Sequence, residues 1–137
     1  MDIKELRIGN IVMCQCRGEY KPHTIKSIWY NDEEKLYYVE LDNGFQCNIN
    51  GITPIPITEE LLLKIGFKKA VDANSLYRYA IDNCLFEIRL WNSGTLIKLE
   101  NYREDCVRKV HLPKTPNLHQ LQNSYNLATG EELEIKL

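Results

Sequence analysis

The sequence predicts an α+β fold: a β-rich N-terminal SH3-like partial barrel, then a β-meander with two short helices. Three observations support this class: several short apolar runs in the first 56 residues, a change of pattern at Pro54 and Pro56, and two segments with helical periodicity. The 137 residues suffice for one ordinary domain or two small parts sharing a core. We therefore expect a β-rich part at 1–56 and an α+β part at 57–137, packed as one unit.

The first part is predicted to consist of four or five short strands. Gly9-Asn10 forms a turn ahead of a strand at 11–16. Residues 35–49, KLYYVELDNGFQCNI, are predicted to form a hairpin with a type I′ turn at Asn43-Gly44, because both central residues of that turn must take positive φ. The strand face predicted to be buried carries Tyr37, Val39 and Leu41.

The second part begins with a short helix at 58–65. Pro54 and Pro56 lack the N–H group that a central strand needs and so mark an extended edge or linker. Thr58 is a good N-cap, and Gly66 can take the left-handed conformation that ends a helix. The strands that follow are predicted at 76–81, 84–90, 95–100 and 106–112, with Phe86, Ile88 and Leu90 facing the core.

The last predicted elements are an amphipathic helix and a closing strand. Thr115 is expected as the N-cap with Pro116 at the first helical position. The apolar stripe of the helix carries Leu118, Leu121, Tyr125 and Ala128, and Gly130 ends it. Beyond it, Leu133, Ile135 and Leu137 alternate with charged residues, which predicts a strand.

Three blocks of the sequence resemble a family of short, uncharacterised proteins common in Bacteroides-type gut bacteria and their phages or mobile elements. The blocks are LRIGNIV (6–12), PITEELLLKIGFKK (56–69) and HQLQNSYNLATGEELEI (119–135), so they span nearly the whole chain. The family ends in a V-H-Q-L-Q-N-L-Y-F-A-L-T-G-E-E-L pattern, from which Ser124 and Asn126 depart by replacing apolar residues. The resemblance implies a cytoplasmic bacterial or phage setting and no particular activity.

Two classes of function fit the sequence. The first is a non-enzymatic interaction or accessory module of a phage or mobile element with a protein partner, for which the predicted interaction face consists of His119, Gln120, Gln122 and Asn123. These side chains mostly lie off the apolar stripe, and the ordinary alternative is a solvated helix face.

The second class is a nucleic-acid-associated accessory protein. The net charge is −2, but residues 61–114 hold ten Lys and Arg against six Asp and Glu. The predicted nucleic-acid contacts are Arg78, Arg89, Trp91, Arg108 and Lys109. The alternatives are an ordinary solvated surface for the charges and cross-strand packing for the aromatic residues, Trp29 and Tyr30 included.

No catalytic, metal or cofactor site is predicted. Cys14, Cys16, Cys47 and His23 could surround a Zn²⁺ ion, but paired C-x₂₋₄-C spacings are absent and small buried side chains explain the cysteines better. Cys106, with Asp105 beside it and His111 and His119 downstream, lacks the local signature of an activated nucleophile.

The sequence also predicts where the protein works. The odd number of cysteines, five, and the N-terminus without an apolar leader favour reduced thiols in the cytoplasm. No apolar run approaches the roughly 20 residues of a membrane span, so no membrane association is expected. The sequence does not predict an oligomeric state.

Overall fold

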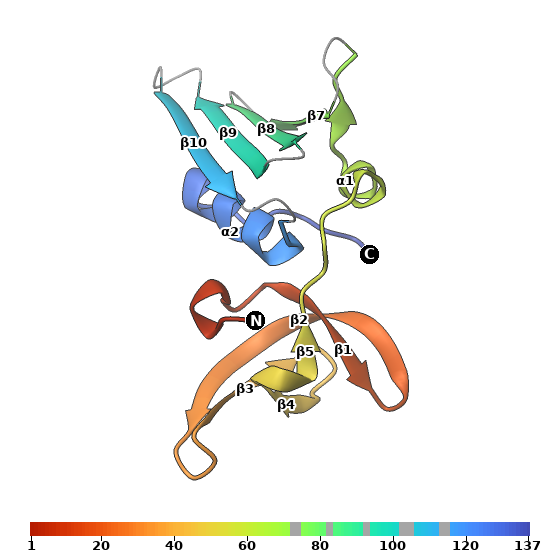
Figure 1. The fold of residues 1–137 in the computed structure, drawn as a ribbon, viewed down its shortest axis with the longest axis vertical. Helices are drawn as coiled ribbons and strands as arrows, with labels where there is room; N and C mark the ends of the chain where they lie inside the picture. Colours follow the sequence, from red (N-terminus) through yellow and green to blue (C-terminus); the bar gives the residue numbers. More distant parts are fainter. Residues whose placement is uncertain (72–74, 82–83, 92–93, 102–105, 113–115) are drawn as a thin grey trace. The chain divides into compact units, whose positions relative to one another are not determined.

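The computed structural model divides the chain into two compact units (Figure 1). It describes residues 1–71, 75–81, 84–91, 94–101, 106–112 and 116–137. Unit 1 comprises Met1–Ile55 and Asn117–Asn123, and unit 2 comprises Pro56–Pro116 and Ser124–Leu137. The first division falls in the predicted proline segment. The prediction that the two parts pack as one unit stays a prediction.

Unit 1 is a curled antiparallel sheet with the strand order β4-β3-β2-β1-β5. Its strands are β1 (Ile11–Cys16), β2 (Glu19–Asn31), β3 (Leu36–Leu41), β4 (Gln46–Asn48) and β5 (Ile52–Thr53). The long β2 pairs with β1 through its first half and with β3 through its second. A register shift between Ile25 and Ser27 separates the halves, and β2 bends strongly there (Figure 1). The predicted bent sheet or partial barrel is confirmed at this level.

The concave side of this sheet holds the core of unit 1. The core consists of Leu6, Val12, Cys14, Cys16, Ile25, Val39, Leu41 and Ile52. Alternate residues of β1 and β3 point into it, as a strand with one buried face requires. Val39 and Leu41 are buried as predicted, whereas Tyr37 is exposed near the end of its hairpin.

The structure has a turn at Asn43-Gly44, but it is not of the predicted type. Asn43 does not take a positive φ, so the predicted type I′ turn is wrong; only Gly44, at φ 78°, is left-handed. The amide of Gly44 donates to the carbonyl of Leu41, which fits a type I turn closed by a left-handed residue. Both Arg17 and Gly18 have positive φ, 52° and 83°, in the two-residue β1–β2 connection, as a type I′ turn requires.

Unit 2 contains a short helix and a five-stranded antiparallel meander. The helix is α1 (Glu59–Ile65), and the strands are β6 (Lys68–Lys69), β7 (Leu76–Ile81), β8 (Cys84–Trp91), β9 (Gly94–Asn101) and β10 (Cys106–Leu112). The sheet order is β10-β9-β8-β7-β6, so each strand neighbours the next one in sequence. The predicted meander and its four long strands are confirmed, and the turns at 82–83 and 92–93 lie outside the described residues.

The short helix α1 has the predicted ends. The hydroxyl of Thr58 accepts a hydrogen bond from the amide of Leu61 at 3.1 Å. Gly66 is left-handed at φ 115°, and its N–H reaches the carbonyls of the last turn. Leu62, Ile65 and Phe67 are buried, which ties the helix and its exit to the core of unit 2.

An aromatic cluster forms one side of the core of unit 2. Phe86 lies 6.1 Å from Phe67 and 5.2 Å from Tyr125, measured between ring centroids. Tyr125 belongs to α2 (Leu118–Thr129), whose C-terminal half belongs to this unit and lies against one sheet face (Figure 1). Phe86 and Ile88 are fully buried on that face, as predicted, and Leu90 is half-buried.

The last helix begins later than predicted. Helical residues start at Leu118, and Asn117 occupies the preceding position, where its amide donates to Oε1 of Gln120 at 2.9 Å. Thr115, the predicted N-cap, lies outside the described residues. The predicted apolar stripe is confirmed for Leu118, Leu121 and Tyr125, which are buried, and Ala128 is half-buried.

The predicted closing strand is wrong. Residues 131–137 form no strand, and Leu133 is the buried residue among them. The apolar alternation therefore reflects one anchoring side chain, not a strand. Among the described residues, no helix has both the length and the apolar character to cross a membrane.

Candidate nucleic-acid interface

The polar side chains at the start of α2 do not form an exposed strip. His119 and Gln122 are buried, with 0% and 2% of their surface exposed, so the prediction of an exposed face is wrong for these two residues. Gln120 and Asn123 are half-buried. The physical reason lies in the chain ahead of β1, whose backbone groups need hydrogen-bond partners once they are removed from water.

Gln122 supplies two of these partners. Its Oε1 accepts a hydrogen bond from the amide of Ile11 at 2.9 Å, and its Nε2 donates to the carbonyl of Gly9 at 3.1 Å. One amide side chain therefore serves a donor and an acceptor of the same turn. The Gln122 side chain thus bonds the backbone at Gly9 and Ile11 in the way that a neighbouring strand would.

Asn123 joins three further groups of the N-terminal segment. Its Oδ1 accepts from Nε of Arg7 and from Nδ2 of Asn10, both at 2.8 Å. Its Nδ2 donates to the carbonyl of Glu5 at 2.6 Å. Asn10 is completely buried, so the bond from its Nδ2 satisfies a polar atom that water cannot reach. The polar face of α2 is thus part of the architecture of unit 1.

His119 is the least satisfied member of this junction. Its Nε2 lies 3.4 Å from Oε2 of Glu5, and its buried Nδ1 has no hydrogen-bond partner among the described residues. Burial lowers the pKa of His119 below its ordinary value, and the carboxylate of Glu5 opposes that shift. The imidazole is therefore held in the neutral form over a wider pH range than a free histidine.

The N-terminal cysteines behave as buried thiols. Cys14 and Cys16 are buried in the core of unit 1, with their Sγ atoms 3.1 Å apart. Burial raises the pKa of the Cys14 thiol well above its usual range, and neighbouring Cys16 and Cys47 raise it further. In the part of the chain that the structure describes, no three or more His, Cys, Asp or Glu side chains are grouped to hold a metal ion.

The hypothesis of a Cys106 nucleophile concerns residues that the structure describes only in part. Asp105 is not described, and Cys106 is described only through its backbone. His111 is exposed on β10 of unit 2, whereas His119 is buried in unit 1. The geometry of this hypothesis therefore lies outside the described residues.

The aromatic residues of unit 1 pair across strands. Trp29 stacks on its register partner Tyr38 with ring centroids 5.8 Å apart, and Tyr30 meets its partner Tyr37 at 5.0 Å. The alternative weighed for these aromatic residues, cross-strand packing, therefore holds for Trp29 and Tyr30.

The β6–β10 sheet of unit 2 brings cations from different strands into one row. Arg78 pairs in register with Glu87, Glu87 with Lys98, and Lys98 with Lys109. Directly paired residues of antiparallel strands share a face, so these four positions lie on the same side of the sheet. Lys68 continues the register at the β6 edge, as the partner of Arg78. We call these five residues the cationic row.

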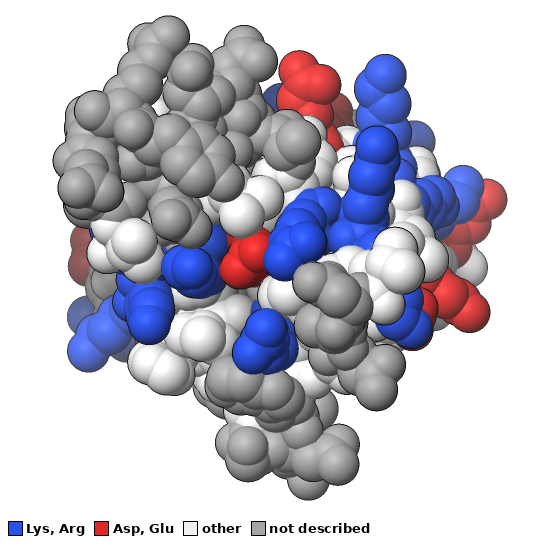
Figure 2. All heavy atoms as spheres, turned by 90° about the horizontal axis from the view of Figure 1, so that it is seen from above, with Lys and Arg blue, Asp and Glu red and all other residues white. Residues whose placement is uncertain are grey.

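The row lies on the sheet face opposite the aromatic core. Phe86 and Ile88 flank Glu87 in β8, and side chains alternate between the faces of a strand. Glu87 and its partners therefore point away from the face that Tyr125 covers. Figure 2 views the molecule from above, where Lys and Arg side chains gather around a carboxylate at the centre.

One carboxylate is set among the four cations of the row. Nε of Arg78 donates to Oε1 of Glu87 at 2.8 Å, with the guanidinium side chain 42% exposed and the carboxylate side chain 13% exposed. The neighbouring Lys69 is not part of the row: its ammonium pairs with Glu59 of α1 at 3.1 Å. Within the row, four cations therefore accompany one carboxylate.

The structure unites some of the predicted nucleic-acid contacts and separates others. Arg78, Arg89 and Lys109 occupy the same sheet face, because Arg89 is two residues from Glu87 in β8. Arg108 has the opposite strand parity and lies on the other face. For Trp91 the structure describes only the backbone.

Two cations of the row, Lys68 and Lys98, are absent from the sequence prediction. Their only signal is the strand register, which places Lys98 directly between Glu87 and Lys109. Neither residue has a neighbour in sequence that marks it as a contact. Whether any of these residues touches nucleic acid stays a prediction.

Comparison with known proteins adds no assignment. No family model, no curated protein and no solved structure matches the chain. The functional argument therefore depends on the geometry of the chain itself.

Proposed function

We propose that this protein is a non-enzymatic accessory module that binds nucleic acid through the face of the β6–β10 sheet that bears the cationic row. The observation that carries the proposal is the cationic row, in which Lys68, Arg78, Lys98 and Lys109 stand on four different strands with Glu87 among them. Adjacent strands are about 4.8 Å apart, so the row extends across the sheet for roughly 19 Å. That length suits several consecutive phosphates of a nucleic-acid backbone.

The energetic argument is the release of counterions. Each phosphate that a Lys or Arg side chain neutralises frees condensed cations, which drives binding at low salt whatever the base sequence. The chain as a whole has a net charge of −2, so a general attraction to polyanions is not expected. Binding must then depend on the local excess of residues 61–114, with ten Lys and Arg against six Asp and Glu.

The setting of this activity is also a proposal. The resemblance of the three sequence blocks supports a cytoplasmic role in a bacterium, phage or mobile element. The curled sheet of unit 1 supports its assignment as an SH3-like barrel. No step of the proposed function requires a metal, a cofactor or a reaction.

A protein partner is the second candidate, and one observation favours it. The rings of Tyr30 and Tyr37 form a pair at the end of the β2–β3 hairpin, with 44% and 39% of the residue surfaces exposed. Exposed tyrosines are common anchors in protein interfaces. Capture of a host protein that is lost in Tyr30→Ser/Tyr37→Ser would support this candidate.

A charge-reversal experiment tests the nucleic-acid proposal. Binding of a fluorescein-labelled single strand of about 15 nucleotides is measured by anisotropy between about 50 and 200 mM salt. Lys98→Glu/Lys109→Glu should weaken binding at least about tenfold and flatten the slope of log K against log salt by about 1.4, as expected for two lost phosphate contacts.

The matched control is Lys4→Glu/Lys26→Glu, which makes the same change of charge at exposed positions of unit 1. It should leave the slope of log K against log salt close to that of the original protein. An equal loss in both variants would mean that only net charge matters and would reject the sheet face as the site. Absence of binding by the original protein at about 50 mM salt would reject the function itself.

A further inference from the structure

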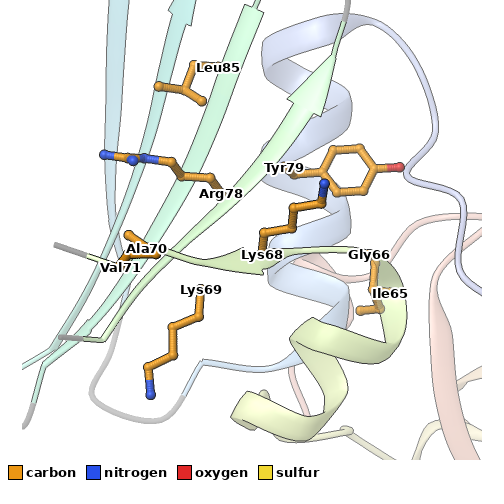
Figure 3. A pocket seen from close by; sticks show the side chains of 9 residues that line it. All are labelled: Ile65, Gly66, Lys68, Lys69, Ala70, Val71, Arg78, Tyr79 and Leu85. Atoms are coloured by element: carbon orange, nitrogen blue, oxygen red, sulfur yellow. The ribbon is translucent and has the colours of Figure 1, made fainter. Parts of the chain in front are cut away.

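A hollow lies at the β6 end of the cationic row, where the sheet edge is incomplete. β6 pairs with β7 only at Lys68↔Arg78 and Lys69↔Tyr77, while β7 continues through residues 79–81. The hollow occupies the space beside this continuing edge and has a volume of about 620 Å³. Figure 3 shows Arg78 and Leu85 on one side of it and Tyr79 on the other.

The walls of the hollow combine apolar surface with positive charge. Ala70, Val71 and Leu85 supply aliphatic surface, and Tyr79 supplies a planar ring. Lys68 lines the same hollow and has no ion-pair partner among the residues that the structure describes. A fitting ligand therefore has a flat or apolar body joined to an anionic group.

The size of the hollow is compatible with such a ligand. Small-molecule sites usually enclose about 300–1,000 Å³, with mostly apolar walls and a few polar groups that fix orientation. The hollow falls within that range. Its open side allows a ligand to remain attached to a longer chain.

The hollow and the cationic row share Lys68 and Arg78. A backbone whose phosphates follow the row therefore passes the mouth of the hollow. A base of a single strand can turn into it, whereas bases in a duplex are paired and stacked and can enter only at the cost of unpairing.

We propose that the hollow between β6 and β7 receives an unpaired base of a single-stranded nucleic acid whose phosphates lie along the cationic row. The inference rests on the proposed function and adds to it a preference for single strands over duplex. Arg78, on the row side of the hollow, holds the phosphate next to the inserted base, and the aliphatic walls, the Tyr79 ring and the Lys68 side chain beside that ring surround the base (Figure 3).

The test compares strands that differ in their bases but not in their phosphates. The probes are fluorescein-labelled oligothymidylate of about 15 nucleotides, an abasic strand of equal length and a hairpin duplex. Oligothymidylate should bind about five- to tenfold more tightly than the abasic strand, with the duplex no tighter than the abasic strand.

The hollow-filling variant Ala70→Phe should remove this difference and leave the affinity for the abasic strand unchanged. Leu127→Phe is the control, because Leu127 is 76% exposed on α2 and does not line the hollow. Thermal melting followed by circular dichroism checks that both variants fold. The original protein provides a second measurement: the methyl NMR signals of Ala70, Val71 and Leu85 should shift with oligothymidylate and not with the abasic strand.

The outcomes separate the inference from the proposed function. Equal affinity for oligothymidylate and the abasic strand, both weakened in Lys98→Glu/Lys109→Glu, would overturn the base site and leave the row in place. Methyl shifts that are the same with both strands would overturn it as well. Failure of every strand to bind would overturn both proposals.

Discussion

The side chain of Asn123 forms hydrogen bonds with three residues of the N-terminal segment. Its side-chain oxygen accepts from Arg7 and Asn10, and its nitrogen donates to the carbonyl of Glu5. Removing the side chain leaves the amide of the fully buried Asn10 without this acceptor. A buried polar group that loses its partner costs about 1–3 kcal/mol, and more when a charged group is involved.

We therefore expect Asn123→Ala to lower the free energy of unfolding by about 2–4 kcal/mol in urea titrations. Asn126→Ala makes the same change in the same helix, where the side chain bonds only at the exposed C-terminal end. That control should cost less than about 1 kcal/mol. Equal losses in the two variants would contradict the role assigned to the junction.

His119 gives unit 1 a dependence on pH. Burial lowers its pKa below the ordinary value of 6.5, so the unfolded chain takes up a proton more readily than the folded protein does. This contribution to stability is fully present above pH 6.5 and is lost as the pH falls from 6.5 toward the lowered pKa of the folded state. The melting temperature should accordingly decrease in that interval.

Replacement of His119 by Gln removes the titrating group, and the decrease of melting temperature below pH 6.5 should become shallower. Melting curves of the two proteins, recorded by circular dichroism over a series of pH values, provide the measurement. Parallel curves for the two proteins would show that another group causes the dependence.

Residue burial was predictable where side chains are apolar. The alternation in β1 indicated that Cys14 and Cys16 share a face, and both are buried. For His119 and Gln122 the same reasoning failed, because polar residues are usually exposed and periodicity carries no information about distant hydrogen-bond partners. Their partners lie more than 100 positions away, at Glu5, Gly9 and Ile11.

At the scale of elements, the two helix C-termini allow a matched comparison of glycines. Gly66 after α1 and Gly130 after α2 are both left-handed, with φ of 115° and 74°. A Cβ atom at Gly66 would lie 3.4 Å from Cε2 of Tyr79, whereas one at Gly130 would meet nothing within 4 Å. Both positions therefore disfavour a residue with a side chain, and Gly66 lies farther from the left-handed minimum near about 57° than Gly130 does.

Gly130→Ala should cost about 1–2 kcal/mol, the usual penalty for a residue with a side chain in the left-handed region. Gly66→Ala should cost at least as much, because its φ of 115° lies farther from the left-handed minimum near about 57°. Urea unfolding of both variants measures the difference. A smaller loss for Gly66→Ala would contradict this expectation.

Local signals decided which elements the sequence could predict. Thr58 and Gly66 marked the ends of α1, because capping depends on a few adjacent residues. The Asn43-Gly44 pair fits both a two-residue turn and a longer turn closed by a left-handed glycine, and the sequence does not choose between them. The alternation after Gly130 predicted a strand that would have needed a partner, and pairing cannot be read from one segment.

At the scale of the whole molecule, the net charge does not show where the charged side chains gather. The net charge of −2 concealed a sheet face on which cations meet from strands up to 41 positions apart, Lys68 and Lys109. The strands themselves were predictable from apolar alternation. Their register was not, because it depends on turns and on cross-strand packing, and it is the register that aligns Arg78, Glu87 and Lys98.

The division of the chain has a consequence for its synthesis. Unit 1 draws on residues 117–123, which follow the whole stretch assigned to Pro56–Pro116. A ribosome therefore releases the first sheet well before the amide groups that complete it have been translated. Until then the carbonyl of Gly9 and the amide of Ile11 can bond only to water, because Gln122 has not been synthesised. A nascent chain stalled before that point therefore exposes an incompletely folded unit 1 to proteases and chaperones.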